Sequence, residues 1–178
     1  MKKLLTLLLL TISFSSFAQR RSYVQIGPAA YLSTKGTSGY FGGGLGAGTS
    51  RGVGGAGIGI EMVSKGTQTI LPVYADMRCY FSQKKTSLYA TLQPGYHFRN
   101  SPVKTVDHIN IKDKGGIYAG IGIGVYSFDR KSPGFNFQLK YVFMQDKVRK
   151  SYENSSAGDS FISSTHGGYL SLSFSLVL

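Results

Sequence analysis

The chain has 178 residues, with 20 Lys and Arg against 8 Asp and Glu, and a formal net charge of +12. It has 24 glycines, 12 tyrosines and 11 phenylalanines but no tryptophan, a composition that favours β structure over helix. The length suggests one domain. The single cysteine, Cys79, cannot form a disulfide within the chain, which excludes a disulfide-stapled secreted scaffold.

The first residues have the three parts of a secretory signal. A basic start at Lys2 and Lys3 precedes an apolar run from Leu4 to Ile12, and small residues stand at Ser16 and Ala18. The apolar run is too short for a membrane-spanning helix, which needs about 20 residues. The alternative, a buried first helix, fits the pattern less well. We therefore expect a signal peptide over 1–18, cleaved after Ala18, and one barrel domain over 19–178.

The charge balance bears on the partners of the exported domain. Lys2 and Lys3 lie in the signal, so its removal lowers the net charge from +12 to +10. An exported chain rarely meets nucleic acid, so we expect no nucleic-acid partner. Anionic lipid headgroups or sugars are the partners that a basic exported surface favours.

Long segments with strand character follow the signal along the whole chain. They exceed the roughly 5–6 residues common in soluble strands and suit the roughly 9–11 residues that a tilted membrane strand requires. Their even number puts both chain ends on one side, as in closed bacterial barrels. The eight predicted strands are 22–32, 39–50, 53–63, 69–81, 86–98, 116–128, 134–145 and 167–178.

Each segment has one apolar face and one small or polar face, because successive strand side chains point to opposite sides. A soluble lipocalin-like barrel would turn the apolar face inward, whereas a membrane barrel turns it outward. Few charged residues lie well inside the segments, and a soluble barrel would carry charges over its exterior. The pattern therefore favours the apolar face outside, with aromatic residues near the strand ends as interfacial girdles. These aromatic residues are Phe41, Phe81, Phe98, Phe135 and Phe143.

The final segment carries the clearest alternation. Apolar residues at every second position from Leu170 to Leu178 are separated by Ser171, Ser173 and Ser175, and Phe174 supplies an aromatic residue. Following an export signal, this segment resembles the closing strand of Gram-negative outer-membrane β-barrels. The mature chain as a whole resembles the small barrels typified by the OmpA transmembrane domain and OmpX. The resemblance implies an all-β, eight-stranded antiparallel up-and-down transmembrane β-barrel in the cell outer membrane, without a cofactor.

The connections alternate between short turns and longer loops, which is the asymmetry of outer-membrane barrels. The two long connections, 99–115 and 146–166, are rich in Ser, Asn, Lys and Asp, and we expect mobile loops there that could hold a surface ligand. Pro28, Pro72 and Pro94 fall inside strands and each removes a ladder donor, so we expect local bulges around them.

Four charged residues on the small or polar face should be buried by this fold. Pairing through the 64–68 turn sets Tyr74, Asp76 and Arg78 opposite glycines at 55, 57 and 59, and Lys140 falls opposite Gly122 or Gly124. An eight-stranded barrel has room only for side chains, and buried charges must neutralise one another. We predict an interior salt-bridge plug, with a polar pore lining as the alternative. Its members are Glu61, Asp76, Arg78 and Lys140.

Other motifs are weaker. Gly52 to Gly57 satisfies G-x-G-x-x-G, but strand rather than helix follows, so we interpret the match as chance. His97, His108 and His166 do not have metal-ligand spacing. The best candidates for catalytic residues lie in one serine-rich stretch, where a nucleophile and a base could meet, although the signal is weak. These are Asp159, Ser163, Ser164 and His166.

The sequence thus predicts an outer-membrane barrel with a structural or surface-interaction role and no catalysis. The alternatives are a narrow outer-membrane channel, an outer-membrane lipid-modifying enzyme and a soluble periplasmic barrel. The expected partners are outer-membrane lipids, the barrel-assembly machinery acting through the C-terminal strand, and a ligand of the two long connections.

Overall fold

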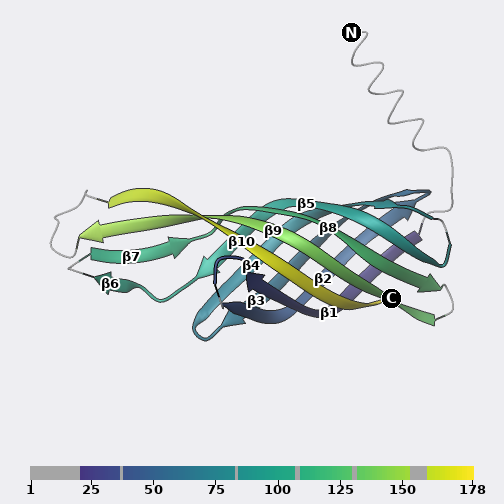
Figure 1. Ribbon diagram of the computed structural model, residues 1–178, viewed down its shortest axis with the longest axis horizontal. Helices are drawn as coiled ribbons and strands as arrows, with labels where there is room; N and C mark the ends of the chain where they lie inside the picture. The colour runs from purple at the N-terminus through teal and green to yellow at the C-terminus, as the bar shows by residue number, and fades with distance from the viewer. Residues whose placement is uncertain (1–20, 37, 83, 107–108, 130–131, 153–159) are drawn as a thin grey trace, which may run out of the picture.

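The computed structural model describes residues 21–36, 38–82, 84–106, 109–129, 132–152 and 160–178. This part of the chain contains no helix long and apolar enough to cross a membrane. Its strands form one antiparallel sheet (Figure 1). They are β1 (Arg21–Ser33), β2 (Gly39–Arg51), β3 (Gly54–Lys65), β4 (Gln68–Tyr80), β5 (Thr86–Asn100), β6 (Lys104–Val106), β7 (Ile109–Lys114), β8 (Gly116–Asp129), β9 (Ser132–Tyr152) and β10 (Ser160–Val177).

Eight of the described strands close a barrel. They follow the order β1-β2-β3-β4-β5-β8-β9-β10, in which each strand pairs with the next along the barrel wall. Closure comes from β1 and β10, which pair from Gln25 with Val177 to Ser33 with Tyr169. A closed barrel leaves no open sheet edge at this seam. The predicted eight-stranded up-and-down barrel is confirmed.

The barrel has two different ends. One end, here called the turn end, carries Leu178 and the short connections, including the turn at Gly52 between β2 and β3. The opposite end is called the hairpin end and includes the turn at Gly66. Gly52 and Gly66 have φ angles of 58° and 57°, a left-handed conformation that a side chain disfavours.

The prediction of two long loops is wrong for most of their described residues. β9 continues to Tyr152, β10 begins at Ser160, and β6 and β7 form a further hairpin in the 99–115 connection. Beyond the start of β8, β9 pairs with β7 instead, from Lys114 with Lys147 to Ile109 with Tyr152. The backbone groups of β9 therefore keep a partner past the barrel rim. Figure 1 shows this four-stranded extension of β6, β7, β9 and β10 projecting from the hairpin end.

The expected bulges at the prolines are also absent from the described ladders. Around Pro28, Ile26 pairs with Leu176 and Ala29 with Ser173, so the ladder is interrupted but no extra residue is inserted. The ladder between β3 and β4 is interrupted in the same way at Pro72, and that between β4 and β5 at Pro94. At each proline the ladder to one neighbouring strand loses two residue pairs, while the ladder to the other neighbouring strand continues through the proline.

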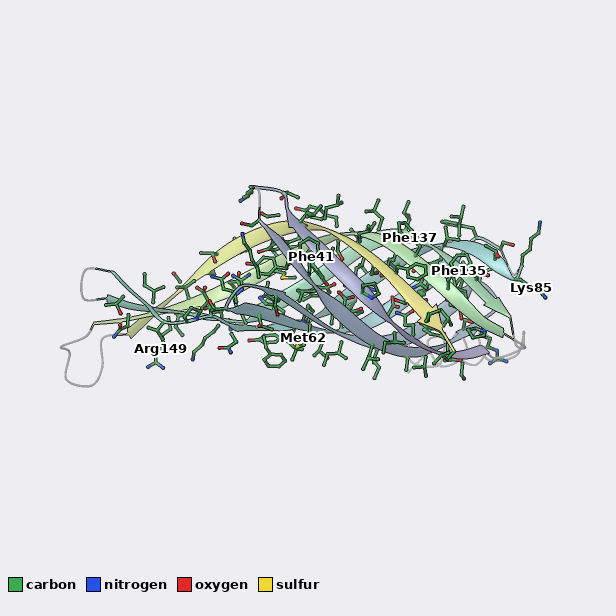
Figure 2. All side chains as sticks on the ribbon, turned by 90° about the horizontal axis from the view of Figure 1, so that it is seen from below. Phe41, Met62, Lys85, Phe135, Phe137 and Arg149 are labelled. Atoms are coloured by element: carbon green, nitrogen blue, oxygen red, sulfur yellow. The ribbon has the colours of Figure 1, made fainter. Side chains whose placement is uncertain are left out.

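The apolar face is outside, as predicted. Ile121, in the middle of β8, is 62% exposed, and the alternating leucines of β10 and the five girdle phenylalanines are exposed as well. Phe81 and Phe135 lie near the turn end, whereas Phe41, Phe98 and Phe143 lie towards the hairpin end. Cys79 is also exposed, on the outside of β4 near the turn end. Figure 2 shows Phe41, Met62, Phe135 and Phe137 on the outer wall.

Candidate functional site: the interior polar network

Strand alternation brings four charged side chains into the barrel. Glu61 comes from β3, Asp76 and Arg78 from β4, and Lys140 from β9. All four are buried, and Lys140 has no exposed surface. They lie in the middle of the barrel, between two buried layers that contain tyrosine and apolar residues. The turn-end layer holds Tyr23, Tyr80, Tyr89, Tyr126 and Val177; the hairpin-end layer includes Tyr40, Val63, Ile70, Val142, Met144 and Tyr169.

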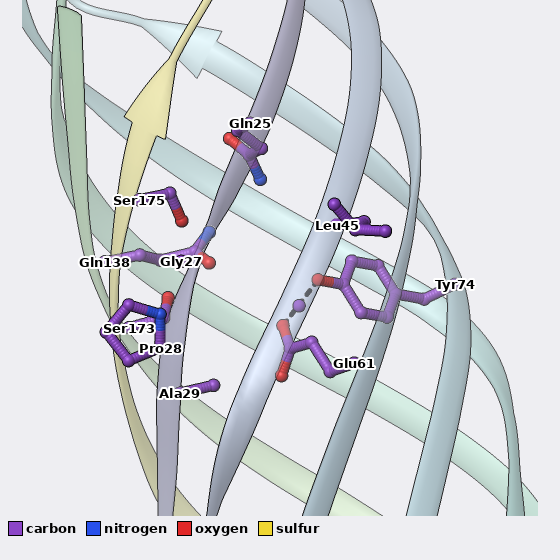
Figure 3. A pocket seen from close by; sticks show the side chains of 11 residues that line it. Gln25, Gly27, Pro28, Ala29, Leu45, Glu61, Tyr74, Gln138, Ser173 and Ser175 are labelled. Carbon is purple, nitrogen blue, oxygen red and sulfur yellow. Dashed lines mark hydrogen bonds between the residues drawn. The ribbon is translucent and has the colours of Figure 1, made fainter.

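Glu61 and Lys140 form an ion pair across the interior. Lys140 Nζ lies 2.8 Å from Glu61 Oε1. The hydroxyls of Tyr31 and Tyr74 both donate hydrogen bonds to the Glu61 carboxylate, and Figure 3 shows Tyr74 directed towards it. Three donors from three other strands thus compensate the removal of this carboxylate from water.

Asp76 and Arg78 form the second pair, two residues apart on the same face of β4. Arg78 Nη2 lies 2.6 Å from Asp76 Oδ2, and Arg78 Nε donates to the same oxygen at 2.8 Å. Thr91 Oγ1 donates to Asp76 Oδ1 at 2.8 Å. Arg78 Nη2 also donates to Gln25 Oε1 at 2.9 Å, which joins β4 to β1. The pair therefore connects β4 to β1 and β5, in addition to neutralising its own two charges.

Gln93 on β5 connects the two ion pairs. Its Oε1 accepts a hydrogen bond from Lys140 Nζ at 3.1 Å. Its Nε2 donates to Asp76 Oδ1 at 3.1 Å. One amide side chain therefore joins a cation of one pair to an anion of the other. The result is one connected network, called here the interior polar network.

Tyrosine rings surround both cations. The guanidinium carbon of Arg78 lies 4.8 Å from the ring centroid of Tyr23 and 4.9 Å from that of Tyr89. Lys140 Nζ lies 5.2 Å from the ring centroid of Tyr74. Rings within about 6 Å stabilise a cation, most strongly where water is excluded.

Glycines make room for these long side chains. The predicted pairing is confirmed: Gly59 stands opposite Tyr74, Gly57 opposite Asp76 and Gly55 opposite Arg78, and Gly122 stands opposite Lys140. A Cβ at Gly59 would lie 2.5 Å from the Tyr74 ring. Any larger residue at Gly59 would displace the tyrosine that holds Glu61.

A small cavity lies beside the network. A cavity of about 10 Å³ lies at the wall near Gln25, Pro28, Glu61 and Gln138 (Figure 3). This volume is roughly what one water molecule requires. It lies beside the ladder interruption at Pro28, so it reflects a local defect in strand packing.

A second polar cluster lies at the hairpin end, and the sequence did not indicate it. His97 Nε2 lies 2.8 Å from Asp146 Oδ1, and Arg99 Nη1 lies 2.9 Å from Asp146 Oδ2. Arg99 Nη2 also donates to the hydroxyl of Tyr169 at 3.4 Å. Asp146 continues the inward face of β9 past Lys140, so extending the alternation by a few residues could have found it.

The described residues considered for catalysis all lie on β10 and do not share one face. Ser164 and His166 are exposed on one face of β10, whereas Ser163 lies at an alternate position and so points to the other. The His166 ring stacks on Phe143, with centroids 5.6 Å apart. Asp159 and His108 lie outside the described residues. Among the described residues, no group of three or more His, Cys, Asp or Glu side chains is arranged to hold a metal ion.

No protein-family model matches this chain, and no curated protein matches it. Solved structures do resemble it. The outer membrane protein OprG from Pseudomonas aeruginosa is 11% identical with a TM-score of 0.62, covering 91% of this chain and 97% of that chain. Neisserial surface protein A is 13% identical with a TM-score of 0.59, covering 88% and 97%. The outer membrane protein AlkL is 10% identical with a TM-score of 0.52, covering 91% and 90%. At these identities the likeness establishes a shared fold.

Proposed function

We propose that this chain is an outer-membrane β-barrel whose interior is closed by the interior polar network. Its role is then structural or one of surface interaction, without catalysis and without an open path for solutes. The observation that carries the proposal is the pairing of Glu61 with Lys140 and of Asp76 with Arg78 at full burial. Charges that line a water-filled pore need no such partners, whereas charges in a dry interior must have them.

The outer surface supports a place in a membrane. Apolar side chains cover the barrel wall on all sides, with aromatic residues towards both ends. In water such a surface would be an unusually large exposed apolar area. The hydrocarbon of a bilayer can contact it without a free-energy penalty. The solved structures that share the fold include three described as outer-membrane or surface proteins.

The two ends suggest an orientation. Short turns face the periplasm and longer connections face outward in bacterial outer-membrane barrels. By this rule the turn end of the barrel faces the periplasm, and the extension of β6, β7, β9 and β10 projects outside. The signal predicted over 1–18 lies outside the described residues and would deliver the chain to this route. The closing strand β10 would engage the barrel-assembly machinery, and lipids would surround the wall.

Fractionation combined with gel migration tests the proposal. The protein should be recovered with outer membranes, and it should migrate differently before and after boiling, because a closed barrel resists detergent until it is heated. Recovery in the soluble periplasmic fraction, with the same migration in both samples, would favour the lipocalin-like alternative and overturn the proposal.

A further inference from the structure

Basic residues gather on one face of the extension, just beyond the barrel rim. Lys114 on β7 and Lys147 and Arg149 on β9 are exposed. Figure 2 shows Arg149 projecting away from the extension. These three residues are called the basic patch.

Strand register sets like charges directly opposite each other in this patch. Lys114 pairs with Lys147, and the backbone position of Lys112 pairs with Arg149 two residues further along the same ladder, with Asp113 and Val148 paired between them. Like charges directly opposite across a sheet destabilise it. The extension therefore has an arrangement that opposes its own folding, unless an anion lies against it.

The described acidic residues of this region lie on the other side of the sheet. Asp113 and Asp146 occupy the alternate positions, where Asp113 accepts a hydrogen bond from Ser101 and Asp146 binds His97 and Arg99. Within the described residues, none of the ion pairs found involves Lys114, Lys147 or Arg149. The two faces are thus segregated by charge, so nothing in this part of the chain neutralises the basic patch.

The patch also has a defined height above the apolar wall. Along the outward face of β9, Tyr141 and Phe143 are followed by Gln145, then Lys147, then Arg149. Lys147 is four residues past Phe143, about 13 Å along a strand and roughly 10 Å along the barrel axis after a tilt of about 40°. The headgroup layer on each side of a bilayer is about 6 Å thick. Lysine and arginine side chains can extend back towards it while their stems cover apolar surface.

We infer that the basic patch binds the phosphate groups of anionic lipids in the surrounding outer leaflet. This inference rests on the proposed membrane location and names a ligand for the extension. Lipid phosphates match the patch in charge, lie within reach of side chains that extend back towards the headgroup layer, and surround the barrel on all sides. They would also relieve the repulsion between Lys114 and Lys147, so lipid binding and the order of the extension are coupled.

Lipid titration of the full chain, refolded in zwitterionic micelles, tests the inference by native mass spectrometry. The wild type should retain phosphatidylglycerol in preference to phosphatidylcholine. The Lys147→Gln/Arg149→Gln variant should lose phosphatidylglycerol affinity by roughly twenty-five-fold, since each basic residue near an anionic surface contributes roughly fivefold. Phosphatidylcholine binding should not change.

A matched control removes the same charge elsewhere. The Lys65→Gln/Lys84→Gln variant changes two exposed lysines outside the patch and should bind phosphatidylglycerol as the wild type does. An equal loss in both double variants would mean that net charge alone attracts the lipid, and would overturn the inference. Full competition by inorganic phosphate at the same concentration would also overturn it, because the patch would then be a site for free phosphate.

A second variant separates binding from folding. Lys147→Glu replaces a like-charge pair with an opposite pair facing Lys114, so in neutral micelles the barrel should be at least as stable as the wild type while its phosphatidylglycerol preference is lost. Gel migration of the same samples shows whether the barrel is closed. A heat-modifiable wild type without lipid preference would refute the inference and leave the proposed function standing. Failure to form a heat-modifiable barrel would refute the proposed function itself.

Discussion

Lys140 on β9 and Glu61 on β3 lie opposite each other across the barrel, with Nζ 2.8 Å from Oε1 and both side chains almost fully buried. They are 79 residues apart in the sequence. Both charges are removed from bulk water, so each is stabilised by the other and by the hydrogen bonds of Tyr31, Tyr74 and Gln93. This pair is the centre of the interior polar network.

Replacing Lys140 with Met should destabilise the barrel strongly, because Glu61 is left as an uncompensated buried charge. The expected loss in the free energy of unfolding is about 3–5 kcal/mol, measured by urea titration in detergent or lipid. Lys84→Met, at an exposed turn, is the control and should cost much less. The double variant Lys140→Met/Glu61→Gln should recover much of the loss. No recovery in the double variant would mean that the cost arises from packing rather than from charge.

Replacing Arg78 with Ala should have an effect of similar size, since it leaves Asp76 unpaired and removes the cation between Tyr23 and Tyr89. Arg78→Lys keeps the charge but loses the donors to Asp76 and Gln25, so it should lie between wild type and Arg78→Ala. Lys112, in the extension, and Arg149 of the basic patch offer a comparison outside the barrel, where substitution should cost less. The free energy of unfolding of each variant checks the order. Arg78→Ala with wild-type stability would contradict a buried ion pair.

Replacing Gly59 with Ala should destabilise the barrel by about 1–3 kcal/mol, the usual cost of overpacking an interior. The new methyl group would meet the Tyr74 ring and displace its hydroxyl from Glu61. Gly36→Ala is the matched control, because a Cβ there has no neighbour within 4 Å. Thermal or urea unfolding of the two variants side by side makes the comparison. Equal stability of both would show that Tyr74 does not fill the space against Gly59.

Replacing Ile121 with Arg should destabilise the barrel by about 2–4 kcal/mol, the cost of a charge on the lipid face near the bilayer centre. Ile121→Leu, which keeps the side chain apolar, should be close to wild type. Both are compared by unfolding in lipid vesicles. Full tolerance of arginine at this position would mean that this face does not meet hydrocarbon.

The sequence was informative wherever one strand face differs strongly from the other. The alternation from Leu170 to Leu178 predicts β10 because lipid selects one set of side chains and the interior another. Register could be predicted as well, since a long inward residue such as Tyr74 needs a glycine opposite it. The pairing of Lys140 with Glu61 rather than with Asp76 could not be predicted, because it depends on strand positions across the closed barrel.

The extension was missed for a physical reason. Beyond Gln145 the residues of β9 are mostly polar on both faces, so the alternation of apolar and polar residues fades. Val148 is the only apolar residue from Asp146 to Lys150. The contact of His97 with Asp146 joins residues 49 positions apart and depends on the continuation of β9 past Gln145. The prolines do not require bulges, because the ladder between β1 and β10 loses two residue pairs at Gly27 and Pro28 without changing its register.

Conductance across a planar lipid bilayer tests the closed interior most directly. The purified, folded protein should insert without giving steady channel currents, because the interior polar network and the tyrosine layers fill the space inside eight strands. The same preparation must be heat-modifiable on a gel, which shows that a folded barrel was tested. A stable ohmic current on the nanosiemens scale would contradict the closed interior and establish the protein as a channel.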